Sequence, residues 1–369
     1  MSPSNRLLSV DVFRGMTMAA MVLVENPGAW PIYRQFQHAK WGDPITFKDW
    51  IFPFFLFIMG LSVTLSLTKR LKAGISRSKL FQKIIIRALI LFSLGLLLHF
   101  YYFVFFGRFR IPGILQRIAI VYFICAVLFL LTSWRIQIGI IAATLLGYWI
   151  LMTAVPVPGI GPANLDPETN LAAWLDQTLL NGFLRNPQSD PQGILSTLPA
   201  ICIGLIGLLA GQWLQKDINS REKILGFMGT GIGLVLIGWI WGLTFPILRD
   251  IWTSSYVLYT SGFTILAWSF CYWIVDIRRL KGWTTPFAAY GASCIFVFLA
   301  SHIVGALLYI IRIPAPTGKS ISLQRVIVDN LFLSWLNPQN ASALFALCVV
   351  LLWLIPLWIL YNKRIYIKI

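Results

Sequence analysis

The stretch "FQHAKWGDPITFKDWIFPFFLFIMG", residues 36–60, places a titratable side chain directly before a long apolar run. Histidine titrates near neutral pH, so His38 can act as a general base toward an amine or hydroxyl, and its neutral ring is a nucleophile toward a thioester. Asp43 or Asp49 can orient the ring, and Trp41 can anchor the loop at the depth of lipid headgroups. Two plainer alternatives stay open: His38 is a solvated loop residue, and Asp49 only caps the following helix.

The composition of the chain indicates what kind of scaffold holds these side chains. Of 369 residues, 58% are hydrophobic and only 12% are charged, against about 25% charged in soluble domains. The mean hydropathy is +0.76, and several apolar stretches are about 20 residues long, enough to cross roughly 30 Å of hydrocarbon as helices. We therefore expect one all-α domain, residues 1–369, built as a polytopic membrane helix bundle of about ten transmembrane helices.

The first of these stretches contains two charged residues and lacks a small-x-small cleavage site, so we expect a retained span rather than a signal peptide. The predicted helical spans are roughly 7–25, 50–68, 84–106, 113–132, 136–155, 193–214, 223–243, 250–274, 286–311 and 342–361.

The distribution of Lys and Arg orients this bundle. With the N-terminus inside, the predicted cytoplasmic segments hold 17 of these residues and the outer segments hold 10. The positive-inside rule therefore favours both termini in the cytoplasm and His38 on the outer face. The net charge of +17 lies in short clusters between spans. No basic, aromatic-interleaved stretch of soluble character is present, which argues against a nucleic-acid partner.

Ionisable and polar groups inside apolar spans are functional candidates, because a charge at mid-span costs about 2.5–3.5 kcal/mol. Asp11 and Arg14 stand at i and i+3 on one helix face. They either form an ion pair that fixes the first span or contribute to the wall of a site. Gln116 and Arg117 in "GILQRIAIVYF" are expected to face a polar cavity rather than lipid.

The outer face gathers further polar residues. "NPG" after the first span is a turn signal that returns the chain over the bundle, with Asn26 at its start. "DPQGILST" and "RDIWTSSYVLYTSG" are two more polar clusters; Ser254 and Ser255 in the second either line a site or bond across helices. The three histidines, His38, His99 and His302, are far apart and have no cysteine at ligand spacing, so no metal site is expected.

The order of the motifs resembles one known family. "RLLSVDVFRGMTMAAMVLVENPG", "HAKWGDPITFKDWIFPFFLFIMG", "RIPGILQRIAIVYF", "DPQGILSTLPA", "IWTSSYVLYTSG" and "PFAAYGASCIFVFLAS" follow one another as in the heparan-alpha-glucosaminide N-acetyltransferases and their bacterial relatives. The resemblance runs from about residue 6 to 305. It implies an acyltransferase that takes an acetyl group from cytoplasmic acetyl-CoA and passes it to an amino sugar on the far side, with its active-site histidine at His38.

The sequence departs from this family pattern at two places. The family often has asparagine at the position of Glu25, and here Asn26 follows instead; Ser293 in "GAS" replaces the asparagine of the family's "GMN". The resemblance therefore predicts a reaction class rather than one acceptor. It also predicts a chain without the large extracytoplasmic domain of the animal enzymes.

We therefore expect an acetyl-CoA-dependent amino-sugar N-acetyltransferase, a multi-pass protein of the cell's inner (plasma) membrane, with His38 as base or acyl carrier. The alternative is a secondary transporter of a sugar or lipid-linked substrate, which also needs intramembrane charges. The inner basic loops either hold CoA phosphates or reflect the positive-inside bias alone.

Expected partners are acetyl-CoA as donor substrate, an amino-sugar or glycan acceptor, membrane lipids and, as an open option, a second copy in a homodimer. The predicted residues are catalytic His38, Asp49 and Asn26, and substrate-binding Asp11, Arg14, Trp41, Gln116, Arg117, Ser254 and Ser255.

Overall fold

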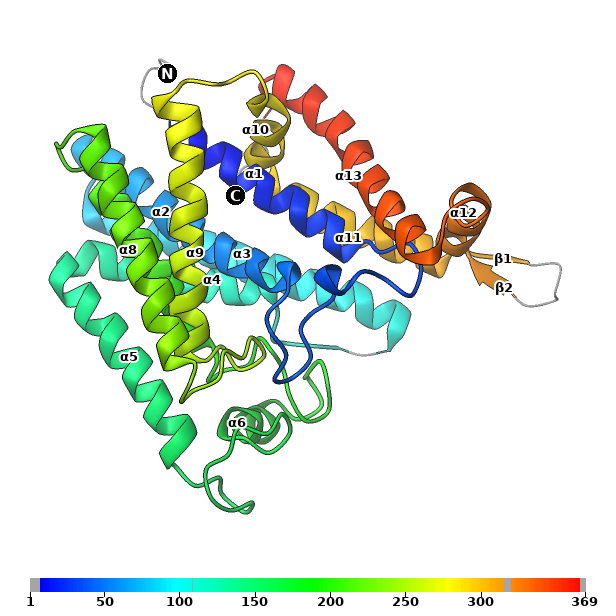
Figure 1. The fold of residues 1–369 in the computed structure, drawn as a ribbon, viewed down its shortest axis with the longest axis horizontal. Helices are drawn as coiled ribbons and strands as arrows, with labels where there is room; N and C mark the ends of the chain where they lie inside the picture. Colours follow the sequence, from blue (N-terminus) through cyan, green and yellow to red (C-terminus); the bar gives the residue numbers. More distant parts are fainter. Residues whose placement is uncertain (1–6, 108, 315–319, 366–369) are drawn as a thin grey trace. The chain divides into compact units, whose positions relative to one another are not determined.

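The computed structural model describes residues 7–107, 109–314 and 320–365. Arg6, Arg108, Lys319 and Lys368, which enter the charge count above, lie outside the described residues. The expected all-α class is confirmed, with one small antiparallel hairpin in addition (Figure 1). The elements are α1 (Leu8–Glu25), 3-10 helix η2 (Arg34–Phe36), α2 (Phe47–Lys72), α3 (Arg77–Phe106), α4 (Ile114–Leu131), α5 (Trp134–Ala154), α6 (Leu171–Leu180), α7 (Thr197–Leu214), α8 (Ser220–Trp241), α9 (Ser254–Tyr272), π-helix η3 (Trp273–Ile277), α10 (Thr284–Ala292), α11 (Cys294–Ile310), β1 (Arg312–Pro314), β2 (Ser320–Ser322), α12 (Leu323–Leu331) and α13 (Pro338–Asn362).

Among the described residues, eight helices are long and apolar enough to cross a membrane, and a ninth span results if α10 and α11 count as one. The eight are α2, α3, α4, α5, α7, α8, α9 continued through η3, and α13. Helix α1 corresponds to the first of the ten predicted spans, 7–25. Its 18 residues include Asp11, Arg14 and Glu25, which explains why α1 does not qualify as an apolar span.

The prediction of one continuous span over 286–311 is wrong. Helices α10 and α11 meet at an angle of 81°, and the break lies at Ser293, whose φ of −129° and ψ of 34° leave helical geometry. Small residues surround this point, in "GASC". Because no proline marks the break, apolar content alone cannot distinguish this bent pair from a straight helix.

The described residues group into two compact units. Unit 1 consists of residues 7–39, 46–51 and 271–365, and unit 2 of residues 40–45 and 52–270. That the whole chain acts as one functional domain stays a prediction.

In unit 1, α1 packs along α10, and α13 packs against both (Figure 1). Two glycines allow the close approach: a Cβ on Gly15 would lie 1.7 Å from the carbonyl oxygen of Phe287, and one on Gly291 would lie 2.0 Å from that of Asp11. The start of α1 is held by Asp276 of η3, whose carboxylate accepts the backbone N–H groups of Leu8 and Ser9 at 3.2 and 3.1 Å. A carboxylate there satisfies free helix donors and complements the helix dipole.

In unit 2, α4 packs against α3 and α7, and α5 packs against α7. One hydrophobic cluster joins Tyr148 and Met152 of α5 to Phe245, Leu248 and Ile251, which follow α8. The segment between α5 and α7 contains α6 and the long polar turns around it (Figure 1). This segment and the N-terminal end of α4 supply most of the polar side chains of unit 2 described below.

Candidate active site

His38 and Asp49 lie together in unit 1. The Nδ1 atom of His38 is 2.8 Å from Oδ1 of Asp49, the third residue of α2. The Asp49 carboxylate is fully buried, whereas the imidazole is 29% exposed. The second carboxylate oxygen accepts the backbone N–H groups of Ala39 and Thr46, both at 3.0 Å. One buried carboxylate therefore fixes both the ring and the loop that carries it.

Asp49 also caps α2, as one of the sequence alternatives proposed. Thr46 precedes the first residue of the helix, and its N–H is bound by the side chain three positions later, the arrangement of a capping box. The hydroxyl of Thr46 donates to the carbonyl of Gln37 at 2.6 Å. Capping and ring orientation are thus performed by the same side chain rather than being exclusive.

The hydrogen bond to Asp49 fixes the chemistry available to His38. An ionised carboxylate only accepts, so Nδ1 of the ring carries the hydrogen. In the neutral ring, Nε2 is then the nitrogen with the lone pair, as a general base or nucleophile requires. The imidazole is part-exposed, while its buried partner holds its orientation.

Charged side chains surround the end of α1 nearby. Lys48 Nζ lies 3.2 Å from Oε1 of Glu25 and donates to the carbonyl of Val24 at 3.1 Å. The positive charge of Lys48 and, when they are protonated, those of His302 and His38 act on Glu25. Glu25, at the position where the family often has asparagine, therefore sits in a basic environment within unit 1.

The other predicted residues of unit 1 have structural contacts. Asn26 follows α1 and donates from Nδ2 to the carbonyl of Val22 at 2.7 Å. The predicted pair of Asp11 and Arg14 is present at 3.7 Å, and Arg14 Nη1 also reaches the carbonyl of Gly291 at 3.5 Å. The ion-pair alternative thus has geometric support; a role of these three residues toward substrate stays a prediction.

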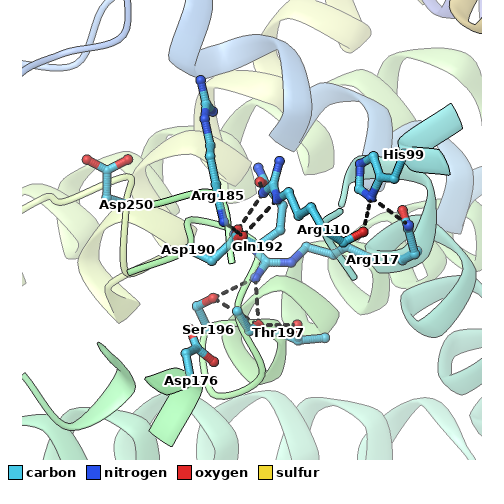
Figure 2. A network of polar contacts seen from close by, with 12 residues as sticks. His99, Arg110, Arg117, Asp176, Arg185, Asp190, Gln192, Ser196, Thr197 and Asp250 are labelled. Atoms are coloured by element: carbon cyan, nitrogen blue, oxygen red, sulfur yellow. Dashed lines mark hydrogen bonds and ion pairs between the residues drawn. The ribbon is translucent and has the colours of Figure 1, made fainter. Parts of the chain in front are cut away.

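Unit 2 contains a separate polar network (Figure 2). Asp190, whose carboxylate is fully buried, binds Arg110 through both oxygens, with Nε to Oδ2 at 2.7 Å. Arg110 Nη2 also bonds to Oε1 of Gln192. The backbone N–H groups of Arg185 and Gln192 donate to the same carboxylate at 2.9 and 2.8 Å. This multiply bonded carboxylate fixes the turn before α7.

Gln116 and Arg117 lie in the first turn of α4, both almost fully buried. Arg117 Nη2 donates to the carbonyl of Gly193 at 3.0 Å and to the hydroxyl of Ser196 (Figure 2). The Nε2 atom of Gln116 is 3.3 Å from Nδ1 of His99. Arg117 is 1% exposed, and its guanidinium lies within a polar cluster; that Gln116 and Arg117 face a polar cavity stays a prediction.

Asp176 of α6 adds a second buried carboxylate beside this cluster. Its Oδ1 accepts the backbone N–H of Ile194 at 2.8 Å. Burial raises the pKa of Asp176 from its ordinary value of 3.8 to about 6, with Asp190 adding to the rise and the Ile194 hydrogen bond and Arg117 opposing it. Asp176 is therefore mostly ionised at neutral pH and titrates in mild acid.

Trp41, Ser254 and Ser255 have packing or bridging contacts in unit 2. Trp41 packs against the hydrophobic cluster that contains Tyr148. Ser254 donates to the carbonyl of Leu145 in α5 at 2.7 Å, and Ser255 donates to the carbonyl of Phe245. Both serines are fully buried, as expected for the helix-bridging alternative. Substrate binding by these three residues stays a prediction.

Some residues of these clusters were not predicted. Lys48 and Arg110 entered the sequence analysis only as loop charges, and Asp276 was not noted. The "DPQG" turn pointed to the region of Asp190 without naming its partner. The sequence did contain a signal for the Arg110–Asp190 pair, because the two residues carry opposite charges and lie on two predicted outer loops. They are 80 positions apart, and the sequence analysis did not pair them. Among the described residues, no group of three or more His, Cys, Asp or Glu side chains is arranged to hold a metal ion.

Comparisons with known proteins agree with the motif order. The family described as heparan-alpha-glucosaminide N-acetyltransferase, catalytic, matches residues 6–239. Two proteins named heparan-alpha-glucosaminide N-acetyltransferase are similar to the chain: the Mus musculus protein is 28% identical over 432 residues, and the Homo sapiens protein is 30% identical over 428. These alignments cover 100% and 99% of this chain but 61% and 60% of the relatives, so it spans less than two thirds of their length. The predicted resemblance is confirmed, and the chain belongs to the heparan-alpha-glucosaminide N-acetyltransferase catalytic family.

Proposed function

We propose that this chain is a membrane acetyltransferase that moves an acetyl group from acetyl-CoA to the amine of an amino sugar. The observation that carries the proposal is the 2.8 Å hydrogen bond between His38 and the buried Asp49. A histidine oriented by a carboxylate is a common arrangement for general-base and nucleophilic catalysis. Family membership supports the reaction class, and the names of the two relatives support the transfer of an acetyl group to the amine of a glucosaminide.

Two routes use the same atoms of His38. In direct transfer, the acceptor nitrogen bonds to the acetyl carbonyl carbon, the carbon–sulfur bond to CoA breaks, and Nε2 takes the proton that the amine loses. The imidazolium then returns this proton to the departing thiolate. In the two-step route, Nε2 first bonds to the acetyl carbon, the carbon–sulfur bond breaks and CoA leaves as the thiolate. The amine nitrogen then bonds to that carbon, the bond to Nε2 breaks, and Nε2 takes the proton that the amine loses. Asp49 stabilises the positively charged ring in both routes.

The two substrates are proposed to approach from opposite sides of the cell's inner membrane. The excess of Lys and Arg in the predicted inner segments supports cytoplasmic termini, which puts the His38 loop outside. Acetyl-CoA sealed inside vesicles should then acetylate an acceptor supplied only outside. Transfer that occurs only when both substrates share the outer face would contradict this arrangement.

The direct test is release of the CoA thiol by purified protein in detergent, with acetyl-CoA and glucosamine. The wild-type chain should release thiol and form the amide, and His38→Ala should not. Tyr33→Phe is the matched control, because Tyr33 lies in the same loop with its ring partly exposed and its hydroxyl bonded to Asn340. If wild type and His38→Ala are equally inactive although both are folded, the proposal fails.

Mass spectrometry separates the two routes. Wild-type protein mixed with acetyl-CoA and no acceptor, then quenched rapidly, should carry an acetyl group on His38 only in the two-step route. Subsequent addition of glucosamine should remove that group at the rate of turnover. Complete absence of the adduct, together with thiol release that requires acceptor, supports direct transfer.

One observation favours the transporter alternative: the 81° break between α10 and α11. Discontinuous helices commonly form substrate sites in secondary transporters. The two functions differ in what changes chemically. Liposomes containing the protein should show acetylated sugar if it is a transferase, and unmodified labelled sugar inside the vesicles if it is a transporter.

A further inference from the structure

The guanidinium of Arg117 is buried with part of its hydrogen-bonding capacity unused. The side chain is 1% exposed. Nη2 bonds to two neutral oxygens, while Nε and Nη1 have no hydrogen-bond partner in the described part of the chain. A buried cation usually has a direct anionic partner, because desolvation of an unpaired charge is expensive. The carboxylates of Asp190 and Asp176 act on Arg117 only electrostatically: Asp190 is bound to Arg110, and Asp176 to a backbone amide.

Trp252 adds a second unused donor at the same place. The centre of the Arg117 guanidinium lies 5.0 Å from the centroid of the Trp252 ring. The indole is also 1% exposed, and its Nε1 has no hydrogen-bond partner in the described residues. Trp252 has a φ of +53°, a conformation rarely adopted by a bulky side chain and found mostly where surrounding structure enforces it.

The surroundings hold these donors in place. Gly193 and Ser196 both bind one nitrogen of the guanidinium, Nη2, and both belong to the turn that Asp190 fixes through Arg110 (Figure 2). Arg117 itself is part of α4, so its backbone is rigid. The unused donors Nε and Nη1 therefore belong to a guanidinium that is anchored at Nη2 and lies over an aromatic ring.

We propose that Arg117 and Trp252 form a binding site for an anionic oxygen group of a substrate, a carboxylate or a phosphate or sulfate ester. Arginine binds such groups through charge-assisted hydrogen bonds, and Nε and Nη1 each offer one unused donor, on either side of the bonded Nη2. This inference rests on the proposed acetyltransferase function for its substrate, since the anionic group belongs either to the acceptor or to CoA. The predicted outer location of the α4 N-terminus and the turn at 190–197 favours the acceptor.

The first experiment needs no turnover. Thermal unfolding of the purified full chain in detergent is measured with inorganic phosphate, sulfate or acetate, against chloride at equal ionic strength. At least one of the three anions should raise the Tm of the wild type and have no such effect on Arg117→Lys, which keeps the charge but loses the planar guanidinium with its separate Nε and Nη1 donors. Arg87→Lys is the matched control, because Arg87 also lies 5.0 Å from an aromatic ring, that of Tyr122, but is exposed. Equal Tm shifts in all three proteins would overturn the site.

The second experiment identifies the source of the anion. KM values are compared for glucosamine, glucosamine 6-phosphate and glucosamine 6-sulfate, and for acetyl-CoA and its 3′-dephospho form. With an acceptor-borne anion, Arg117→Lys should raise KM for the acidic acceptors roughly 10- to 100-fold and leave KM for glucosamine unchanged. With a CoA-borne anion, the rise should appear for acetyl-CoA only and disappear for the dephospho form. No change in any KM would refute the inference.

A milder variant keeps the test valid if Arg117→Lys folds poorly. Trp252→Phe retains an aromatic ring over the guanidinium and removes only the Nε1 donor, so it should weaken anion binding by a smaller factor than Arg117→Lys.

Failure of the inference is distinct from failure of the proposed function. Wild-type acetylation that does not depend on Arg117 contradicts the anion site alone, whereas an inactive wild type that still binds anions through Arg117 contradicts the acetyltransferase alone.

Discussion

Asp49 holds the imidazole of His38 with one carboxylate oxygen and the first turn of α2 with the other. The orientation of the ring is therefore tied to the start of a helix rather than to a flexible loop. A carboxylate with charge-assisted bonds to both elements contributes more than a neutral cap, about 1.5–3 kcal/mol per such bond. Catalysis and local folding share this side chain, so their responses to mutation must be separated experimentally.

Asp49→Asn should lower kcat by about 100- to 10,000-fold if His38 is the base or acyl carrier, because the amide can donate to Nδ1 and favour the wrong ring tautomer. The amide oxygen still accepts backbone N–H groups, so stability should fall by only about 1–2 kcal/mol. Rates of CoA thiol release and thermal unfolding check the two effects. Thr46→Ala is the control: it removes the hydroxyl that donates to the Gln37 carbonyl and to Oδ2 of Asp49, but keeps the Thr46 N–H bond to Asp49 and the Oδ1 atom that faces His38. A stability loss without a rate loss in Asp49→Asn would contradict the assigned role.

Lys48→Met should destabilise unit 1 by about 1–3 kcal/mol, because Glu25 then loses its 3.2 Å partner. The double variant Glu25→Gln with Lys48→Met should recover much of that loss. A double-mutant cycle of unfolding free energies measures the coupling of the two side chains. Strictly additive effects would mean that the pair contributes nothing beyond its separate contacts.

Gly291→Ala should destabilise the contact between α1 and α10 by about 1–3 kcal/mol, because the new methyl group would lie 2.0 Å from the carbonyl of Asp11. Gly229→Ala in α8 is the matched control: a Cβ there meets no heavy atom within 4 Å. Alanine is the better helix former by about 1 kcal/mol, so the control should be neutral or stabilising. Similar Tm values for the two variants would show that the close approach is not needed.

Asp176 should give the chain a pH-dependent stability in mild acid. Its pKa is raised to about 6 by burial, so proton binding stabilises the folded state. That contribution is complete below the unfolded value of 3.8 and is lost as pH rises through about 6. At roughly 1.4 kcal/mol per pKa unit, the upper bound is about 3 kcal/mol. Arg117 and Asp190 face the same carboxylate, with opposite effects.

Unfolding of wild type and Asp176→Asn, measured from pH 4 to pH 7, tests this linkage. The wild type should lose stability relative to the variant as pH rises, because the amide has no proton to release. A difference between the two proteins that is constant across this range would show that Asp176 titrates elsewhere.

The sequence allowed prediction of what depends on near neighbours in the chain. The apolar spans follow from composition, and His38 and Asp49 are 11 positions apart on one loop and the adjoining helix turn, a separation that a single loop can close. The Asp11–Arg14 pair likewise follows from helix spacing. Long-range pairings did not follow: Arg110 with Asp190, Asp276 with the start of α1, and Ser254 with Leu145 each depend on which helices pack together. A pattern of residue types does not specify that packing.

The corner at Ser293 restricts what can surround it. Where α10 stops and α11 starts, the regular helical pairing of N–H and C=O groups is interrupted, and hydrocarbon offers such groups no substitute. Ser293 is 3% exposed, so protein encloses the corner in unit 1. If the two helices together cross a bilayer, acyl chains are therefore kept away from this elbow, and any solvent that reaches it must come through the protein rather than from the lipid phase.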